Sequence, residues 1–301
     1  MSDPVRHPRA ITIENGKIHI NHLSPSSIEA FAGPYGCELA WYYRYIERRP
    51  AGAFGGALLA GRGWDTAMLT AHDQPWVEPD EAAEAFLDEI EHTLARTDEE
   101  WDVASGDLSV MRNRGPLAAK AYVERELPQI HALATQKKIA VRFKEVDWPV
   151  IGYIDRLEAR PAGGVAIADD KATLSTSRKW DEDAANTSLQ LNVYALACAQ
   201  ESIAASSIGY RSARLLKTKQ ELKQAFVPIT EEAKARTVEI IAAVGDRIEH
   251  ACETGVFVPT AYIDQRWKCS QKFCSWYSSC EFGAKARMSA SLAQSAREAG
   301  L

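Results

Sequence analysis

Two apolar segments that each end in acidic residues constrain the fold of this chain most. Residues 152–157 read Gly-Tyr-Ile-Asp-Arg-Leu, and residues 167–171 read Ile-Ala-Asp-Asp-Lys. The sequence Pro-Ala-Gly-Gly at 161–164, a turn pattern, separates them. Because apolar residues precede the acids in both segments, we predict two neighbouring strands, 150–158 and 165–171, whose carboxylates lie where buried strands end.

These two strands would bring Asp155 and Asp169 together. Hard divalent cations prefer oxygen ligands, and Mg²⁺ typically takes one or two carboxylates together with phosphate and water. Lys171 follows Asp169 by two residues, so both side chains point to the same face of a strand. An ammonium group there can help to lower the pKa of an attacking water and balance charge on a reacting phosphate. A hairpin with ordinary acidic ends would explain an isolated Asp-x-Lys, but Gly-x-x-Asp-Arg, a turn and then Asp-x-Lys favours a catalytic metal site.

A helix is predicted at 188–199, directly after these strands. It carries Gln190 and Tyr194, which are four residues apart and therefore share a face. The pair would either bind the phosphate next to the scissile bond and orient water, or belong to a partly buried amphipathic helix. Taken alone, this spacing favours the second interpretation.

The rest of the chain predicts helices first and a sheet later. A helix begins at Ser24-Pro25 and another at Pro34, and further helices are predicted at 57–71, 80–96 and 118–134, the last with a kink at Pro128. Further strands are predicted at 139–145, 208–216 and 224–229, followed by a long helix from Thr230 to about Glu253. The order predicts an α/β fold: a small mixed sheet flanked by helices, with an N-terminal helical elaboration and a C-terminal cysteine-rich tail.

The charge of the chain gives one local signal for nucleic acid. The net charge is −6, but phosphate responds to local patches rather than to the total. Residues 211–223 contain five basic residues, with Glu221 as the only acid: Arg211, Arg214, Lys217, Lys219 and Lys223. This segment is either a phosphate-binding patch or a solvated strand face.

Nothing in the sequence predicts a membrane or secretory segment. The first 17 residues are polar and contain no apolar run of signal-peptide length, and no stretch approaches a transmembrane span. We therefore expect a cytoplasmic protein, in which the six cysteines do not form disulfides.

Taken together, these motifs resemble the RecB-type PD-(D/E)XK nucleases, which include the AddB-type repair nuclease, the CRISPR spacer-acquisition nuclease and phage-encoded exonucleases. The resemblance spans residues 23–283, from Ser-Pro-Ser at 24–26 to the cysteine tail, and Gln-x-x-x-Tyr after Asp-x-Lys is its most specific element. It implies a restriction-endonuclease-like core. It also implies that Asp155 and Asp169 are metal ligands, that Lys171 is the catalytic lysine, and that Gln190 and Tyr194 position the substrate.

One position departs from the family pattern. The family usually places a metal-binding histidine on an early helix, four residues after a glycine. Asp65 stands there in this chain, four residues after Gly61. Aspartate can ligate the same hard ion, so Asp65 is either a further metal ligand or a surface residue.

Three cysteines crowd into twelve residues near the C-terminus: Cys269, Cys274 and Cys280. Three thiolates leave a four-coordinate site incomplete, and Cys37 is the natural fourth ligand. The resemblance implies that these four hold a [4Fe-4S] cluster, although four residues separate Cys269 from Cys274 where the family usually has two. Zinc uses the same ligands, and incidental cysteines are the third alternative. Cys198 and Cys252 lie on predicted helices and are expected to pack.

The sequence thus predicts a Mg²⁺- or Mn²⁺-dependent DNA nuclease, expected to be an exonuclease, in recombination, repair or phage DNA processing. A non-catalytic DNA-binding or scaffold protein with the same fold is the alternative, and RNA stays open as the substrate. The expected domain spans 23–283: a helical part at 23–136, a catalytic core at 137–256 and a cysteine tail at 257–283, between an extension at 1–22 and a tail at 284–301. A helicase, recombinase or single-strand annealing protein is the expected partner, because the chain contains no helicase phosphate-binding motif of its own.

Overall fold

The computed structural model describes residues 9–52, 54–73, 76–96, 101–161, 163–177, 180–260, 268–270 and 273–283. The chain divides into two compact units. Unit 1 consists of Met1–Gly52, Arg142–Ile151 and Val238–Leu301, and unit 2 of Ala53–Val141 and Gly152–Thr237. The predicted tail at 284–301 lies outside the described residues.

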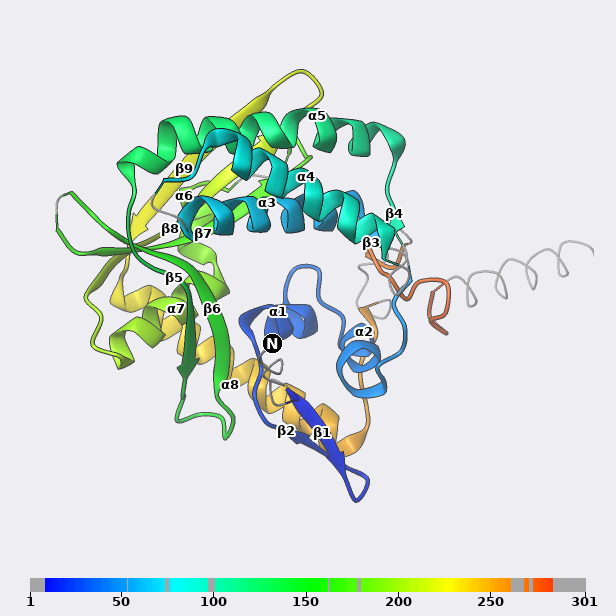
Figure 1. The fold of residues 1–301 in the computed structure, drawn as a ribbon. Helices are drawn as coiled ribbons and strands as arrows, with labels where there is room; N and C mark the ends of the chain where they lie inside the picture. Colours follow the sequence, from blue (N-terminus) through cyan, green and yellow to red (C-terminus); the bar gives the residue numbers. More distant parts are fainter. Residues whose placement is uncertain are drawn as a thin grey trace, which may run out of the picture. The chain divides into compact units, whose positions relative to one another are not determined.

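Unit 2 is built on a five-stranded sheet with the strand order β5-β6-β7-β8-β9 (Figure 1). Its strands are β5 (His131–Val141), β6 (Val150–Ala159), β7 (Val165–Thr173), β8 (Ala205–Leu215) and β9 (Gln220–Pro228). The pairs β6–β7 and β8–β9 are antiparallel, and β7–β8 is parallel. The mixed sheet with flanking helices confirms the predicted fold class.

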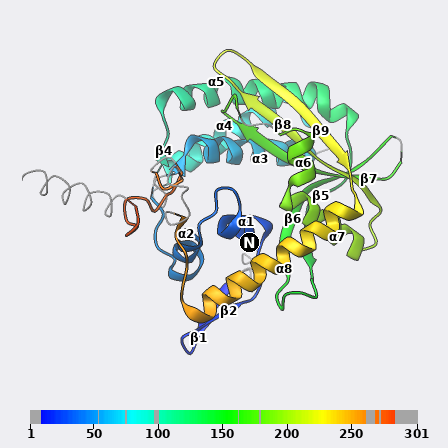
Figure 2. The ribbon, with the colours of Figure 1, turned by 180° about the vertical axis from the view of Figure 1, so that it is seen from behind.

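Strand β7 lies at the centre of this sheet. Its residues 166–170 are all buried, including two acids, as expected for a strand that is covered on both faces. The parallel pair β7–β8 requires a crossover connection, and helices α6 (Glu182–Thr187) and α7 (Leu189–Gln200) supply it. Helix α7 contacts β5, β7 and β8 (Figure 2).

Three helices form an apolar core of unit 2: α3 (Gly56–Asp73), α4 (Pro79–Ala95) and α5 (Ser105–Ala121). Helix α3 contacts both other helices and strand β7, and α5 contacts β8 and β9. Fully buried side chains such as Trp64, Phe86 and Met111 fill the space between them. Strands β7, β8 and β9 therefore pack against a close-packed helical layer.

Two predictions about elements of unit 2 were wrong. The helix predicted at 118–134 ends earlier: α5 passes into a π-helical turn at Tyr122–Glu126 and a short 3₁₀ turn at Leu127–Gln129. Strand β5 then begins at His131, so the strand predicted at 139–145 is longer and starts sooner. Sheet pairing has overridden the helical preference of the Ala132-Leu133-Ala134 segment.

Unit 1 contains a hairpin that the sequence reasoning missed, β1 (Ile11–Glu14) with β2 (Lys17–Ile20). Asn15 and Gly16 turn the hairpin with φ of 52° and 76°, the combination that two-residue hairpins favour. Helix α1 (Pro25–Ala32) begins at Ser24, whose hydroxyl accepts the Ser27 N–H at 3.1 Å as predicted.

The remaining helices are α2 (Glu38–Tyr42), which belongs to unit 1, and α8 (Glu231–Thr254), whose residues are divided between the units at Thr237. Thr230 caps α8 by accepting the Ala233 N–H at 3.1 Å, as predicted. Within the described ranges, no helix combines the length and apolar character needed to span a membrane.

Candidate active site

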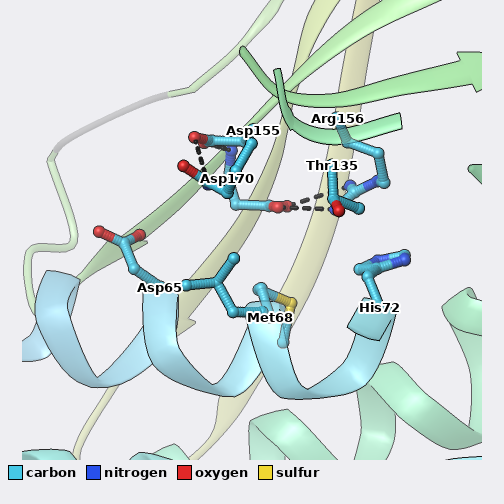
Figure 3. A pocket seen from close by; sticks show the side chains of 9 residues that line it. Asp65, Met68, His72, Thr135, Asp155, Arg156 and Asp170 are labelled. Atoms are coloured by element: carbon cyan, nitrogen blue, oxygen red, sulfur yellow. Dashed lines mark hydrogen bonds and ion pairs between the residues drawn. The ribbon is translucent and has the colours of Figure 1, made fainter. Parts of the chain in front are cut away.

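Asp155 lies on β6 just beyond the paired part of β6 and β7. Its Oδ2 accepts the backbone N–H of Asp170 at 2.9 Å, and its Oδ1 accepts Nε2 of Gln136 at 3.3 Å. Figure 3 shows the Asp155 carboxylate beside Asp170 and above the helix that carries Asp65. Hydrogen bonds from two different strands therefore fix this carboxylate.

Asp169 and Lys171 of β7 point to the same face and form an ion pair. Asp169 is fully buried, and its Oδ1 also accepts Nε2 of Gln190 at 3.1 Å. Gln190 lies in the first turn of α7, which Ser188 caps by accepting the Leu191 N–H at 3.2 Å. The start of α7 thus places an amide next to the central acid.

Tyr194 follows one turn later on α7, and its hydroxyl is 2.9 Å from Nε2 of Gln190, which donates to it. The backbone of Gly152 lies directly against the tyrosine ring: a Cβ at this position would come within 2.9 Å of the Tyr194 Cε1 atom. Glycine in the Gly-x-x-Asp-Arg segment therefore lets the ring approach β6. The structure brings Asp155, Asp169, Lys171, Gln190 and Tyr194 into one region of unit 2.

Buried acids lie close together in this region, and this raises the pKa of their carboxyl groups. Burial, and then the charge of Asp169, raises the pKa of Asp155 to about 8. Burial also raises the pKa of Asp169. Burial alone would lower the pKa of Lys171, but the carboxylates of Asp169 and Asp155 outweigh it and raise that pKa. The lysine is therefore charged, and the acids repel one another.

Asp65 lies on α3 at the rim of a small pocket (Figure 3). The pocket is lined by Asp65, Met68, Leu69, His72, Thr135, Gln136, Asp155, Arg156 and Asp170. The side chain still reaches solvent, although displacement of water by the surrounding protein, together with the charges of Asp169 and Asp170, raises its pKa to about 7. Asp65 therefore shares the electrostatic environment of the predicted catalytic acids.

This donor set suits a hard cation. Carboxylates that raise one another's pKa are stabilised by a divalent ion placed between them, and Mg²⁺ needs only one or two of them. In the described part of the chain, no group of three histidine, cysteine or acidic side chains is arranged to hold a metal ion. The case for a metal site therefore rests on the carboxylate chemistry of Asp65, Asp155 and Asp169 and on their electrostatic influence on one another.

The basic patch predicted at 211–223 separates into a buried and an exposed part. The Arg211 side chain is 8% exposed and bonds Glu158 through two nitrogens, both at 2.9 Å, with Glu126 at 3.2 Å. Arg214 pairs with Glu221 at 3.5 Å. Lys217 and Lys219 are exposed at the connection between β8 and β9, where Lys219 also pairs with Glu221. Of the five basic residues of this patch, the exposed ones are Lys217, Lys219 and Lys223 of β9.

The four predicted ligand cysteines all lie in unit 1, and each is partly buried. Burial raises the pKa of Cys274 to about 11, although a backbone hydrogen bond from Trp276 acts in the opposite direction. The charges of Cys37, Cys280 and Cys269 raise this pKa further. The Thr260 N–H donates to the Cys37 sulfur at 3.4 Å, and the Tyr43 hydroxyl to the Cys280 sulfur at 3.9 Å. Cys37 is therefore an electrostatic neighbour of the three C-terminal thiols.

Several residues that contact the acids or Lys171 were not predicted from the sequence as part of the site. Gln136, which donates to Asp155, has a left-handed φ of 45°, a strained conformation for a non-glycine residue. Trp180 lies with its ring centroid 6.0 Å from Nζ of Lys171. Arg156 and Asp170 form a buried ion pair. Of these, Arg156 and Asp170 lie within the motifs Gly-x-x-Asp-Arg and Asp-x-Lys, but the contacts of all four depend on tertiary packing.

Comparison with known proteins supplies independent information. The family model described as "PD-(D/E)XK nuclease superfamily" matches residues 22–281. The solved structure of a "Putative exonuclease" from Eubacterium rectale aligns with a TM-score of 0.53 and 15% identity, over 81% of this chain and 86% of that one. The protein SSO0001 aligns more weakly, with a TM-score of 0.33 and 12% identity over 76% and 86%. No curated protein matched the chain.

Proposed function

We propose, because the chain belongs to the PD-(D/E)XK nuclease superfamily, that it is a DNA exonuclease of the RecB type that depends on Mg²⁺ or Mn²⁺. The observation that carries this proposal is the proximity of Asp155, Asp169 and Lys171 on two adjacent strands, next to the point where the β6–β7 pairing ends. A scaffold protein would need no half-buried lysine paired with one acid and close to a second. Acids that can hold a metal ion, together with a charged lysine, can stabilise the charge that develops during phosphodiester hydrolysis.

The proposed roles follow from the contacts of each side chain. Asp155 and Asp169, with Asp65, would hold the metal, which when bound polarises the phosphate and activates water. Lys171 offsets negative charge that develops on the phosphate. Gln190 bridges Asp169 and Tyr194, so it is placed to orient the water or the phosphate next to the scissile bond.

A second bound group is proposed for unit 1. The four thiols of Cys37, Cys269, Cys274 and Cys280 suit a [4Fe-4S] cluster, and zinc is the alternative for the same donors. Their mutual electrostatic influence and the two hydrogen bonds to sulfur support a shared thiolate site. The proposed role is structural, because the ligands link the N- and C-terminal segments of unit 1.

The biological setting is proposed from chemistry alone. A nuclease without a nucleotide-binding loop needs another protein to unwind duplex DNA, so a helicase, recombinase or annealing protein is the proposed partner. The proposed location is the cytoplasm, and the proposed processes are DNA recombination, repair or phage DNA processing.

The test uses end-labelled linear DNA and covalently closed circular DNA with the anaerobically purified protein. We expect cleavage of the linear substrate with Mg²⁺ or Mn²⁺, and none in a chelator. Lys171→Ala should reduce the rate by about 100-fold or more, as loss of a transition-state electrostatic contact does. Lys234→Ala, a basic residue on α8, is the control.

Each outcome of this test decides between the candidate functions. Cleavage by Lys171→Ala at the wild-type rate would remove the proposed site. DNA binding without cleavage in any metal would favour the non-catalytic scaffold. Cleavage of circular DNA would replace the exonuclease proposal with an endonuclease, and preference for RNA would change the substrate.

A further inference from the structure

The end of the β6–β7 pairing has an unusual construction. The paired register runs from Ala159 with Val165 to Arg156 with Ala168, and Asp155 and Asp169 come next toward the site. On the site side of the last pair, side chains link the strands. The Asp155 carboxylate accepts the Asp170 N–H at 2.9 Å, and the Arg156 guanidinium bonds the Asp170 carboxylate at 2.7 and 3.2 Å. Asp155 and Arg156, two consecutive residues of β6, therefore both bind Asp170 of β7.

Burial restricts the motion of this ion pair. Arg156 is 1% exposed and Asp170 is 4% exposed. A guanidinium and a carboxylate joined by two parallel hydrogen bonds have a fixed relative orientation, and the fork of arginine is already planar before it binds. Glu158 accepts the remaining Nε–H of Arg156 at 2.8 Å, which prevents rotation of the guanidinium. Asp170 can therefore move only if a buried ion pair breaks.

The pair also controls the charge beside the site. Asp170 stands between Asp169 and Lys171 in sequence, and its side chain is directed to Arg156, as Figure 3 shows. An unpaired carboxylate there would add another negative charge close to Asp65 and Asp155. Pairing with Arg156 places a positive charge directly against that carboxylate and offsets part of its effect on the neighbouring acids.

We infer that Arg156 and Asp170 are positioning residues: their ion pair fixes the Asp170 amide, and this amide holds the Asp155 carboxylate in the orientation that a metal ion requires. The inference rests on the proposed function, because it takes Asp155 as a metal ligand. It assigns a role to the middle residue of Asp-x-Lys and to the arginine of Gly-x-x-Asp-Arg. Neither side chain contacts the metal in this account.

The test compares Asp170→Asn with Glu158→Gln. Both variants remove one carboxylate charge from the same buried network. Glutamine at 158 keeps an oxygen that can accept the Arg156 Nε–H, whereas asparagine at 170 weakens the ion pair that fixes the amide bound to Asp155. Mn²⁺ binding is measured by calorimetry without DNA, and cleavage is measured over a range of Mn²⁺ concentrations. Asp170→Asn should weaken Mn²⁺ binding about 10- to 100-fold, as loss of an outer partner of a metal ligand does, and should shift the Mn²⁺ requirement of cleavage equally.

The rate of Asp170→Asn at saturating Mn²⁺ should return to near the wild-type rate, because no group that touches the substrate is lost. Glu158→Gln should bind Mn²⁺ like the wild type once its folded fraction, measured by circular dichroism, is taken into account. Arg156→Lys keeps the charge but loses the fork, so it should give an intermediate Mn²⁺ affinity. If Asp170→Asn does not fold, Arg156→Lys carries the comparison with Glu158→Gln.

The outcomes separate this inference from the proposed function. A wild-type protein that neither binds Mn²⁺ nor cleaves DNA would overturn the proposed function, and the inference with it. A wild type that does both, with Asp170→Asn or Arg156→Lys unchanged in Mn²⁺ affinity, would overturn the inference alone. Equal weakening in Asp170→Asn and Glu158→Gln would reduce the pair to a structural role and also overturn it.

Discussion

Lys171 shows how single residues of this site depend on one another. Its ammonium is held in a largely buried position only because Asp169 and Asp155 compensate for the loss of water. The same two acids are held close to one another only because Lys171, Gln190 and the Asp170 amide satisfy their oxygens. Removal of any one of these groups leaves a buried charge without its partner, which is costlier than loss of an exposed pair.

His72 gives a prediction at this scale that does not depend on catalysis. Its Nε2 is 2.7 Å from the Tyr122 hydroxyl, and burial, followed by the charge of Arg156, lowers its pKa from 6.5 to about 4. In the unfolded chain the imidazole binds a proton near pH 6.5, whereas the folded protein resists protonation down to about pH 4. Stability should therefore fall as the pH falls from 6.5 to 4, by at most about 3 kcal/mol from this group.

Urea unfolding of the wild type and of His72→Gln over this pH range measures the effect. Glutamine keeps a polar partner for Tyr122 but does not titrate, so the free energy of unfolding of the variant should depend less on pH. The other histidines and the carboxylates titrate in both proteins and cancel in the difference. Parallel curves for the two proteins between pH 4 and 6.5 would contradict the assignment.

At the scale of elements, the connection between β8 and β9 is an exposed basic feature of unit 2. Lys217 and Lys219 lie there, while Arg211 of the same hairpin is enclosed by Glu158 and Glu126. We therefore propose that the two lysines contact DNA phosphates, whereas the Arg211 guanidinium is already paired with Glu158 and Glu126 and lies outside that interface. The Arg114 guanidinium, which donates to the Lys217 carbonyl at 3.3 Å, adds a further positive charge nearby.

The double variant Lys217→Ala/Lys219→Ala tests this interface. Each lost phosphate contact should reduce the slope of log K against log salt by about one, so the double variant should lose about two. Fluorescence anisotropy of labelled DNA over a series of salt concentrations gives the slope. Lys17→Ala/Arg236→Ala removes the same charge from exposed positions elsewhere and should leave the slope close to that of the wild type. An unchanged slope in the lysine variant would exclude the hairpin from the interface.

The same elements show what the sequence could predict. Strands β6 and β7 and the spacing of Gln190 and Tyr194 are local patterns, so alternation, a turn and a helical period were sufficient to predict them. The burial of Arg211 was not predictable, because Glu158 and Glu126, far away in the sequence, determine it. The start of β5 was missed for the same reason. The β1–β2 hairpin was predictable from Asn15-Gly16 but was not recognised.

At the scale of the whole molecule, unit 1 is assembled from segments that are distant in the chain. Within it, Arg247 bonds Glu38 at 2.9 and 2.5 Å, and Glu38 also accepts the Val258 N–H at 2.8 Å. The Trp276 indole donates to the Arg49 carbonyl at 3.2 Å. These contacts join the N-terminal and C-terminal segments of unit 1, and the proposed cluster would join the same segments through metal–thiolate bonds.

The cluster proposal predicts the behaviour of Cys37→Ser. An anaerobic wild-type preparation should be brown and contain about four iron and four sulfide per chain, as a [4Fe-4S] cluster requires. Cys37→Ser should lose the colour and unfold several degrees lower in a thermal melt, because the long loop is no longer closed. Cys252→Ser, a half-buried cysteine on α8, should keep both the colour and the melting temperature.

Metal analysis of these preparations decides between the alternatives. A colourless wild type with one tightly held zinc would replace iron but keep the four-cysteine site. A wild type without metal would contradict both versions.

The interleaving of the two units also sets an order for biosynthesis. Unit 2 ends at Thr237, and the last segment of unit 1 begins at Val238. Ribosomes make the N-terminal part first, and compact units fold as they emerge. All of unit 2, with Asp155, Asp169 and Lys171, is therefore translated before Cys269. We expect the residues of the acidic site to be synthesised first, and the proposed cluster would form only after Cys280 has been translated.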